Sequence, residues 1–257
     1  MARRGVPEIN AGSMADIAFL LLVFFLMVTT IESEEGIFRI LPPPIEDDTE
    51  EVDVRDRDVF VVKVNMNNQL LVENEYIQLN DLKEQAKTFM ISNGVFSDLP
   101  QDPNMPIKSW IRRDSINNEI ETTKAIIAGF DDETDEATRD AAEAKLSKWQ
   151  IKKKVYEEFG RYKPFPGQAI ISMQNDNGTN YETYIGVQSE LTAAVGELRD
   201  ELSIEKFGRS YTELEKEYDR QKNDEDVNDE LKDKVLMIRE VYPLKIVEAE
   251  PANVEKY

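Results

Sequence analysis

The chain has 257 residues, of which 52 are acidic and 31 basic, and its formal net charge of -21 argues against nucleic acid as a partner. It contains no cysteine and no histidine, which excludes disulfides and thiol chemistry and removes the commonest metal ligand. Proton transfer near neutral pH would therefore have to use carboxylates, lysines or tyrosines.

An apolar segment predicts a single transmembrane helix over residues 14–31. Between Ile9 and Ile31 the only charged residue is Asp16, and a spanning helix needs about 20 mostly apolar residues. Two arginines precede this segment and three glutamates follow it within residues 32–35. The positive-inside rule then predicts that residues 1–13 form a cytoplasmic tail and that the bulk of the chain lies on the far side of the membrane.

A cleaved signal peptide is the alternative interpretation of the same segment. The arginine pair and residues 17–28 have the order of a charged region followed by an apolar one. Residues 29–33 (TTIES) offer no A-x-A-like cleavage site, however, and Asp16 interrupts the approach to the apolar run. Both interpretations place most of the chain outside the cytoplasm.

The carboxylate of Asp16 allows two interpretations. Ser13 and Asp16 match a capping box, in which a serine is followed three residues later by an acid, so Asp16 could do no more than start the helix. Ionisable residues within a membrane are costly and often mark ion paths, so Asp16 could instead bind and release protons. A lone helix cannot shield such a group from lipid, and this second interpretation therefore requires helices from another subunit.

Residues 32–57 predict a linker between the apolar segment and a folded domain. Residues 36–41 favour a short extended element, and the three prolines that follow Leu41 favour a stiff, extended backbone. The acid-rich residues 46–58 are unsuited to packing in a core.

The remaining residues, 58–257, predict a small α/β domain with its helices on one face of a sheet. Strands are expected at 59–64, 69–72, 169–173 and 242–247, with a turn at 65–68, a loop at 175–178 and a frayed tail from Glu248. Helices are expected at 82–92 (capped by Asn80-Asp81 and ended by Asn93-Gly94), within 109–128, at 134–159, at 181–202, and over 211–242 with a break near Asn228.

Two of these helices have an expected apolar side. In 181–202 it consists of Tyr184, Val187, Leu191, Val195 and Leu198, at steps of three and four residues. In 134–159 the corresponding residues are Ala141, Leu146, Trp149, Val155 and Phe159. Residues 101–104 are expected to be exposed. No Walker loop, G-x-G-x-x-G, G-x-S-x-G or H-E-x-x-H motif occurs, so the sequence predicts no catalytic residue, no metal site, no cofactor and no enzyme.

Several short stretches resemble the ExbD/TolR family, whose members are single-span subunits of energy-transducing complexes in the bacterial inner membrane. The resemblance is carried by Ile9-Asn10 with Asp16 six residues later, by Leu20-Leu21-Leu22, Phe24-Phe25 and Val28, by Leu41-Pro42, by Asn180-Tyr-Glu-Thr183 and by Pro243-Leu-Lys-Ile-Val247. Two features depart from the family: Gly12-Ser13 stands where Thr-Pro is common, and about 95–167 and 209–239 look like insertions.

The resemblance implies an α+β fold, in which one N-terminal transmembrane helix precedes a small periplasmic domain with largely helical insertions. It implies dimers whose helices sit inside a polytopic ExbB/TolQ-like partner, with Asp16 binding protons that flow down the proton-motive force. It also implies that the domain passes motion to a TonB/TolA-like protein and so energises TonB-dependent outer-membrane transport. The alternatives are a membrane-tethered periplasmic interaction or scaffold protein without proton chemistry, and a Tol-type or flagellar-type stator subunit.

Overall fold

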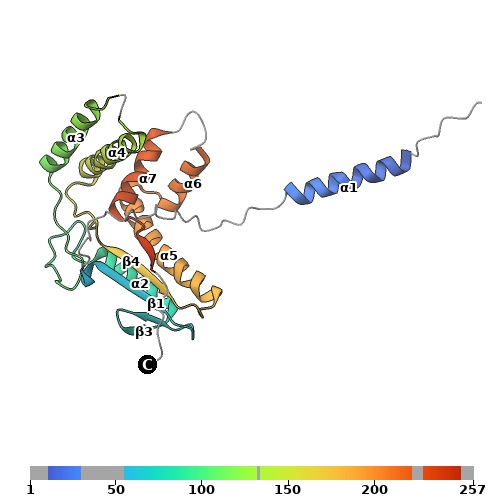
Figure 1. Cartoon of the computed structure of the whole chain (residues 1–257), viewed down its shortest axis with the longest axis horizontal. Helices are drawn as coiled ribbons and strands as arrows, with labels where there is room; N and C mark the ends of the chain where they lie inside the picture. Colours follow the sequence, from blue (N-terminus) through green and yellow to red (C-terminus); the bar gives the residue numbers. More distant parts are fainter. Residues whose placement is uncertain (1–10, 30–54, 132–133, 222–227, 250–257) are drawn as a thin grey trace, which may run out of the picture. The chain divides into compact units, whose positions relative to one another are not determined.

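The computed structural model describes residues 11–29, 55–131, 134–221 and 228–249 (Figure 1). The chain divides into two compact units, residues 1–51 and residues 52–257. In the first unit, the described residues form one helix, α1 (Ala11–Thr29). The predicted linker, apart from residues 55–57, and the extended element at 36–41 lie outside the described residues.

The second unit is built on a five-stranded mixed sheet with the strand order β3-β2-β1-β4-β5. Its strands are β1 (Val59–Val64), β2 (Leu70–Val72), β3 (Glu75–Ile77), β4 (Ile170–Asn175) and β5 (Ile246–Ala249). The first three strands form an antiparallel meander, whereas β4 runs parallel to both β1 and β5. The mixed α/β class and the predicted hairpin of 59–64 with 69–72 are therefore confirmed.

One face of the sheet is buried because apolar side chains alternate along its strands. Phe60 lies opposite Ile171, and Val62 lies between Met173 and Val72; all five are buried. On the other face the intervening residues of β1 and β4 are only partly buried or exposed. The register thus directs one set of side chains into the core.

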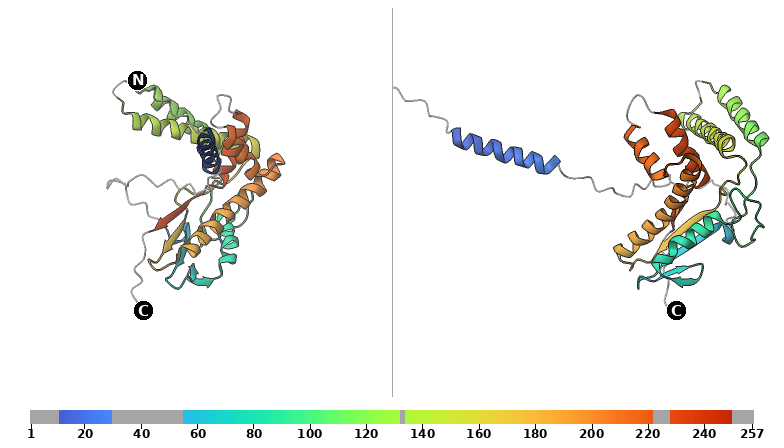
Figure 2. Two further views of the ribbon diagram at one scale, coloured as in Figure 1. Left: turned by 90° about the vertical axis from the view of Figure 1, so that its right-hand side faces the viewer. Right: turned by 180° about the vertical axis from the view of Figure 1, so that it is seen from behind.

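Helices α2 (Leu79–Ile91) and α5 (Tyr181–Phe207) cover this buried face and contact each other. Figure 2 shows both helices on the same side of the sheet, as the sequence predicts. The expected apolar side of α5 is confirmed: four of its five residues are buried and Tyr184 packs against the core partly buried. The side chain of Asn180 caps the start of α5 by accepting a hydrogen bond from the Thr183 N–H at 2.7 Å. The helix extends beyond its predicted end to Phe207 and is followed by Gly208, which has φ +70°.

The remaining helices lie in the two segments that the sequence predicts as insertions. Between α2 and β4 these are α3 (Arg113–Ala128) and α4 (Glu136–Phe159), which pack against each other. Between α5 and β5 these are α6 (Tyr211–Gln221) and α7 (Asp229–Val241), and α7 also contacts α4. The predicted break near Asn228 is confirmed. The side chain of Asn228 caps α7 by accepting hydrogen bonds from the N–H groups of Glu230 and Leu231.

The structure corrects two predicted helix features. Helix α2 begins at Leu79 after Gln78, so Asn80 and Asp81 lie in its first turn and do not cap it. On α4, Val155 is buried but Ala141 is exposed. The predicted apolar side of α4 is therefore only partly buried, because α4 buries little of its length against its neighbours.

The strands also differ from prediction. Strand β5 begins at Ile246 and not at the predicted residue 242, because Tyr242 still ends α7 and donates its N–H to Ile238 O. Glu248 lies within β5, whereas the sequence predicted that a frayed tail begins there. The short strand β3 was not predicted, and a 3-10 turn, η1 (Asp56–Asp58), with a buried Asp58, precedes β1. The expected exposure of residues 101–104 is confirmed.

Candidate functional site

Asp16, the predicted proton-binding residue, lies inside α1. The helix begins at Ala11, and its first turn contains no acidic residue. Ser13 would have to precede the first helical residue to form a capping box with Asp16. Because Ser13 is itself helical, the capping interpretation of Asp16 is wrong, and this carboxylate is displayed from the second turn of the helix.

The side chains from Met14 to Phe24 on α1 are all exposed in the single chain. They include large apolar residues at consecutive positions, among them Phe19, Leu20, Leu21 and Leu22, each more than half exposed. Consecutive positions point to different sides of a helix, so this part of α1 is apolar all round apart from Asp16. Among the described residues, no helix combines the length and apolar character that crossing a membrane requires.

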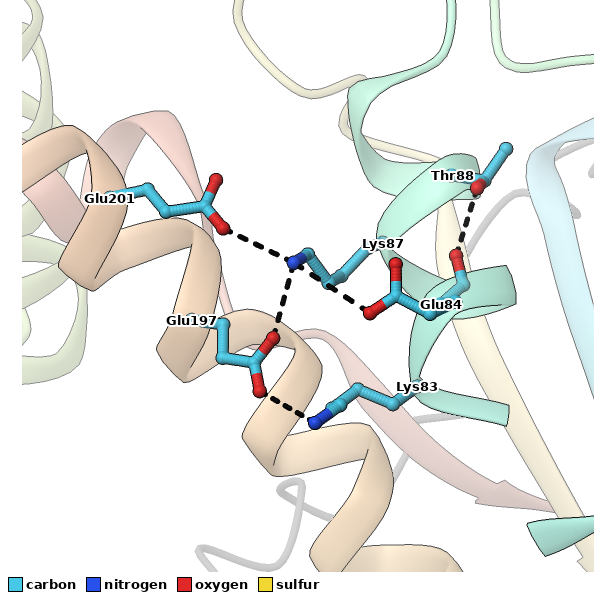
Figure 3. A network of polar contacts seen from close by, with 6 residues as sticks. All are labelled: Lys83, Glu84, Lys87, Thr88, Glu197 and Glu201. Carbon is cyan, nitrogen blue, oxygen red and sulfur yellow. Dashed lines mark hydrogen bonds and ion pairs between the residues drawn. The ribbon is translucent and has the colours of Figure 1, made fainter. Parts of the chain in front are cut away.

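A network of charged side chains joins α2 to α5 in the second unit (Figure 3). Lys83 Nζ lies 2.6 Å from Glu197 Oε1, while Lys87 Nζ lies 3.1 Å from Glu197 Oε2 and 3.2 Å from Glu201 Oε1. The hydrogen bond from Lys83, followed by that from Lys87, lowers the pKa of Glu197. The hydrogen bond to Glu197 raises the pKa of Lys83 in turn. Glu197 therefore remains ionised and fixes two positions of α2 against α5.

Two buried lysines hold the end of α2 to the segment that follows it. Lys108 Nζ donates to Met90 O at 2.5 Å, and Lys163 Nζ donates to Asn93 O at 3.1 Å. Both lysines are at most 3% exposed. Burial, and secondarily the nearby Lys163, lowers the pKa of Lys108 to about 8. The amine of Lys108 thus satisfies a carbonyl of the last turn of α2, which has no intrahelical partner, and that of Lys163 satisfies a carbonyl just beyond the helix.

A third polar cluster joins α5, α6 and α7 around Tyr211. Arg239 donates to the Tyr211 hydroxyl and to Glu215 Oε1, each at 2.7 Å, and Tyr211 itself donates to Glu215. Arg199 reaches the same hydroxyl at 3.4 Å and donates to Tyr242 O at 2.9 Å. Burial raises the pKa of Tyr211, so its hydroxyl stays protonated and able to donate.

Sequence reasoning identified none of the residues in these three clusters as paired. The spacing of Lys83 with Lys87 and of Glu197 with Glu201, four residues in each helix, is a signal that could have indicated facing charged rows. The clusters connect elements of the domain to one another, and among the described residues no group of acids is arranged to hold a metal ion.

Together, an apolar helix carrying one carboxylate and a separate mixed α/β domain define a two-part protein. A family model described as "Biopolymer transport protein ExbD/TolR" matches residues 2–198, which include α1, the sheet up to β4 and most of α5. The chain belongs to the ExbD/TolR family, which confirms the resemblance noted in the sequence. Comparisons with curated proteins and with solved structures gave no match.

Proposed function

We propose that this protein is a proton-motive-force-transducing subunit of an ExbB/ExbD-type complex in the bacterial inner membrane, and that Asp16 is its protonatable group. The observation that carries the proposal is the lone carboxylate of Asp16 in the otherwise uncharged stretch 9–31 of a member of the ExbD/TolR family. No other residue of this stretch has an ionisable side chain.

The proposed membrane segment comprises α1 and the uncharged residues that flank it. Its apolar side chains face all directions around the helix, which favours an apolar environment on every side. Within such an environment Asp16 needs a partner group or a water-filled path, because a charge exposed to lipid is costly. The N-terminus would then be cytoplasmic and the mixed α/β domain periplasmic.

The proposed partners follow from this arrangement. A second copy of the chain and a polytopic ExbB/TolQ-like subunit would supply the helices that shelter Asp16. A TonB/TolA-like protein would receive the motion in the periplasm and energise outer-membrane transport. The α2–α5 ion pairs and the Tyr211 cluster support this role, since they join helices of the domain so that it can move as a unit. The proposed role is not enzymatic and needs no cofactor.

A membrane-tethered scaffold without proton chemistry is the second candidate, and the strongly acidic composition favours it as a binding protein. The two functions differ in what they require of Asp16. Proton transduction needs an ionisable group at this position, whereas a tether needs only a helix of sufficient length and apolar character.

Substitutions at position 16 separate the two candidates in the assembled membrane complex. Asp16→Asn should assemble normally but abolish proton flux and energy-dependent uptake, whereas Asp16→Glu should retain part of both because it keeps an ionisable group. Ser13→Ala is the matched control. It should leave both activities unchanged because it removes no ionisable group. Full proton flux and uptake with Asp16→Asn would contradict the proposal and favour the tether.

A further inference from the structure

A cavity of about 380 Å³ opens between α2, the start of β1 and the turn that joins β2 to β3. Phe60, Val72, Phe89 and Met105 provide its apolar lining, and the rings of Phe60 and Phe89 lie 5.3 Å apart between centroids. Met105 comes from the loop that follows α2, in the predicted insertion at 95–167. The volume is at the lower end of the range of roughly 300–1,000 Å³ that is typical of small-ligand sites.

The charged residues that line this cavity are mostly acidic. Four carboxylates, those of Asp56, Glu73, Glu75 and Glu84, accompany one cation, Arg57. All four acids are exposed, so they stand at the opening, while Phe60, Val72 and Phe89 are buried beneath them. The cavity therefore combines an apolar floor with a negatively charged rim.

The lysines of α2 form their hydrogen bonds with α5 and not with the acids of the rim. Lys83 and Lys87 reach toward α5, whereas Thr88, which lines the cavity, points away from α5 (Figure 3). Lys87 passes 3.9 Å from Glu84, but its hydrogen bonds go to Glu197 and Glu201. Lys83 and Lys87 thus serve mainly the contact between α2 and α5.

Two polar groups of the cavity are held in unusual arrangements. Glu73 has φ +47°, which is rare for a residue with a side chain, and its Oε1 accepts the Val61 N–H at 2.9 Å. This bond leaves its second carboxylate oxygen, Oε2, available to a ligand. Arg57 Nε is buried and has no hydrogen-bond partner among the described residues, which is uncommon for a buried polar atom.

We propose that this cavity binds a lysine or arginine side chain from an extended, basic segment of a partner protein. The aliphatic stem of such a side chain packs on the apolar floor while its cationic head pairs with the carboxylates at the rim. The acid-rich residues 46–53 of this chain carry the wrong charge to occupy the site. The proposal does not depend on Asp16 or on proton flow.

Binding of a defined peptide to the purified full-length chain tests this proposal. The probe is a fluorescently labelled Ala-Lys-Ala-Lys-Ala peptide amide, and its matched control carries norleucine, which keeps the aliphatic stem but lacks the ammonium group. The variants are Glu75→Gln combined with Glu84→Gln, which removes two rim charges, and Thr88→Trp, which fills the cavity from an exposed helical position. Glu143→Gln on the exposed surface of α4 removes a carboxylate away from the cavity.

The lysine peptide should bind the wild type. Its affinity should fall at least about fivefold for the double variant and further for Thr88→Trp. For Glu143→Gln the affinity should stay within about twofold of the wild-type value. The affinity should also weaken as salt is added, because the rim is exposed. Absence of binding to the wild type, or equal binding to all variants, would overturn the proposal. Equal binding of the norleucine peptide would also overturn it and would assign the cavity to an apolar segment.

Discussion

Replacing the buried Lys108 by methionine should remove a pH dependence from the stability of the domain. The Lys108 side chain is 2% exposed and lies near Lys163 without a carboxylate partner among the described residues. Burial lowers its pKa from the ordinary value of 10.5 to about 8. Its charged form is therefore costly in the folded protein, and that cost disappears when the amine loses its proton.

The direction and size of the effect follow from proton linkage. Between these two pKa values the unfolded chain binds more protons than the folded one, so stability increases as pH rises. The full difference in pKa corresponds to roughly 3 kcal/mol. Of this, roughly 2 kcal/mol should appear between about pH 7.5 and about pH 9.5. Methionine has a similar length and no charge, so the variant should lose this slope.

Urea unfolding of the wild type and of Lys108→Met over this pH range measures the slope directly. The difference between the two proteins isolates Lys108, because their other titrating groups are shared. Lys163→Met is a further control, since removing the neighbouring charge should bring the pKa of Lys108 closer to its ordinary value and reduce the slope. Parallel stability curves for the wild type and Lys108→Met would refute the assignment of a depressed pKa to Lys108.

Two further substitutions test the core and a helix end by the same unfolding measurement. Leu191→Ala should lower the free energy of unfolding by about 2–5 kcal/mol because Leu191 of α5 is completely buried. Ile204→Ala, at a position 55% exposed, should change it by about 0.5 kcal/mol or less. Equal losses would contradict the packing of α5. Gly160→Ala should cost about 1–3 kcal/mol because Gly160 ends α4 with φ +84° and ψ −158°. Gly167→Ala, where φ is not positive and an added Cβ meets open space, should not destabilise, and a similar loss at both glycines would show that backbone strain is not the cause.

The two segments that the sequence predicts as insertions, 95–167 and 209–239, do more than extend the surface of the domain. The loop after α2 covers the end of that helix through Lys108 and contributes Met105 to the acidic-rimmed cavity. The segment after α5 returns to it through Tyr211 and Arg199. Both segments are therefore tied to the elements that cover the sheet, and a partner that binds at the cavity would contact core and insertion together.

The elements that the sequence predicted well depend on neighbours along the chain. The alternation of apolar residues in β1, the apolar side of α5 and the helix break near Asn228 are all local patterns. The family resemblance also rests on short stretches, above all the residues around Asp16. The predictions failed where a local pattern was ambiguous, as at the start of α2, or atypical, as in the turn before β3, where Glu73 and Asn74 both have positive φ.

The sequence alone thus determined the division of this chain into an apolar segment with one carboxylate and a mixed α/β domain. Only the tertiary structure decided that β1 pairs in parallel with β4, that Glu197 meets two lysines of α2, and that Lys108 is buried at the end of that helix. The physical reason is distance along the chain: periodicity and capping act over a few residues, whereas these pairings join distant segments whose meeting depends on how the whole core packs.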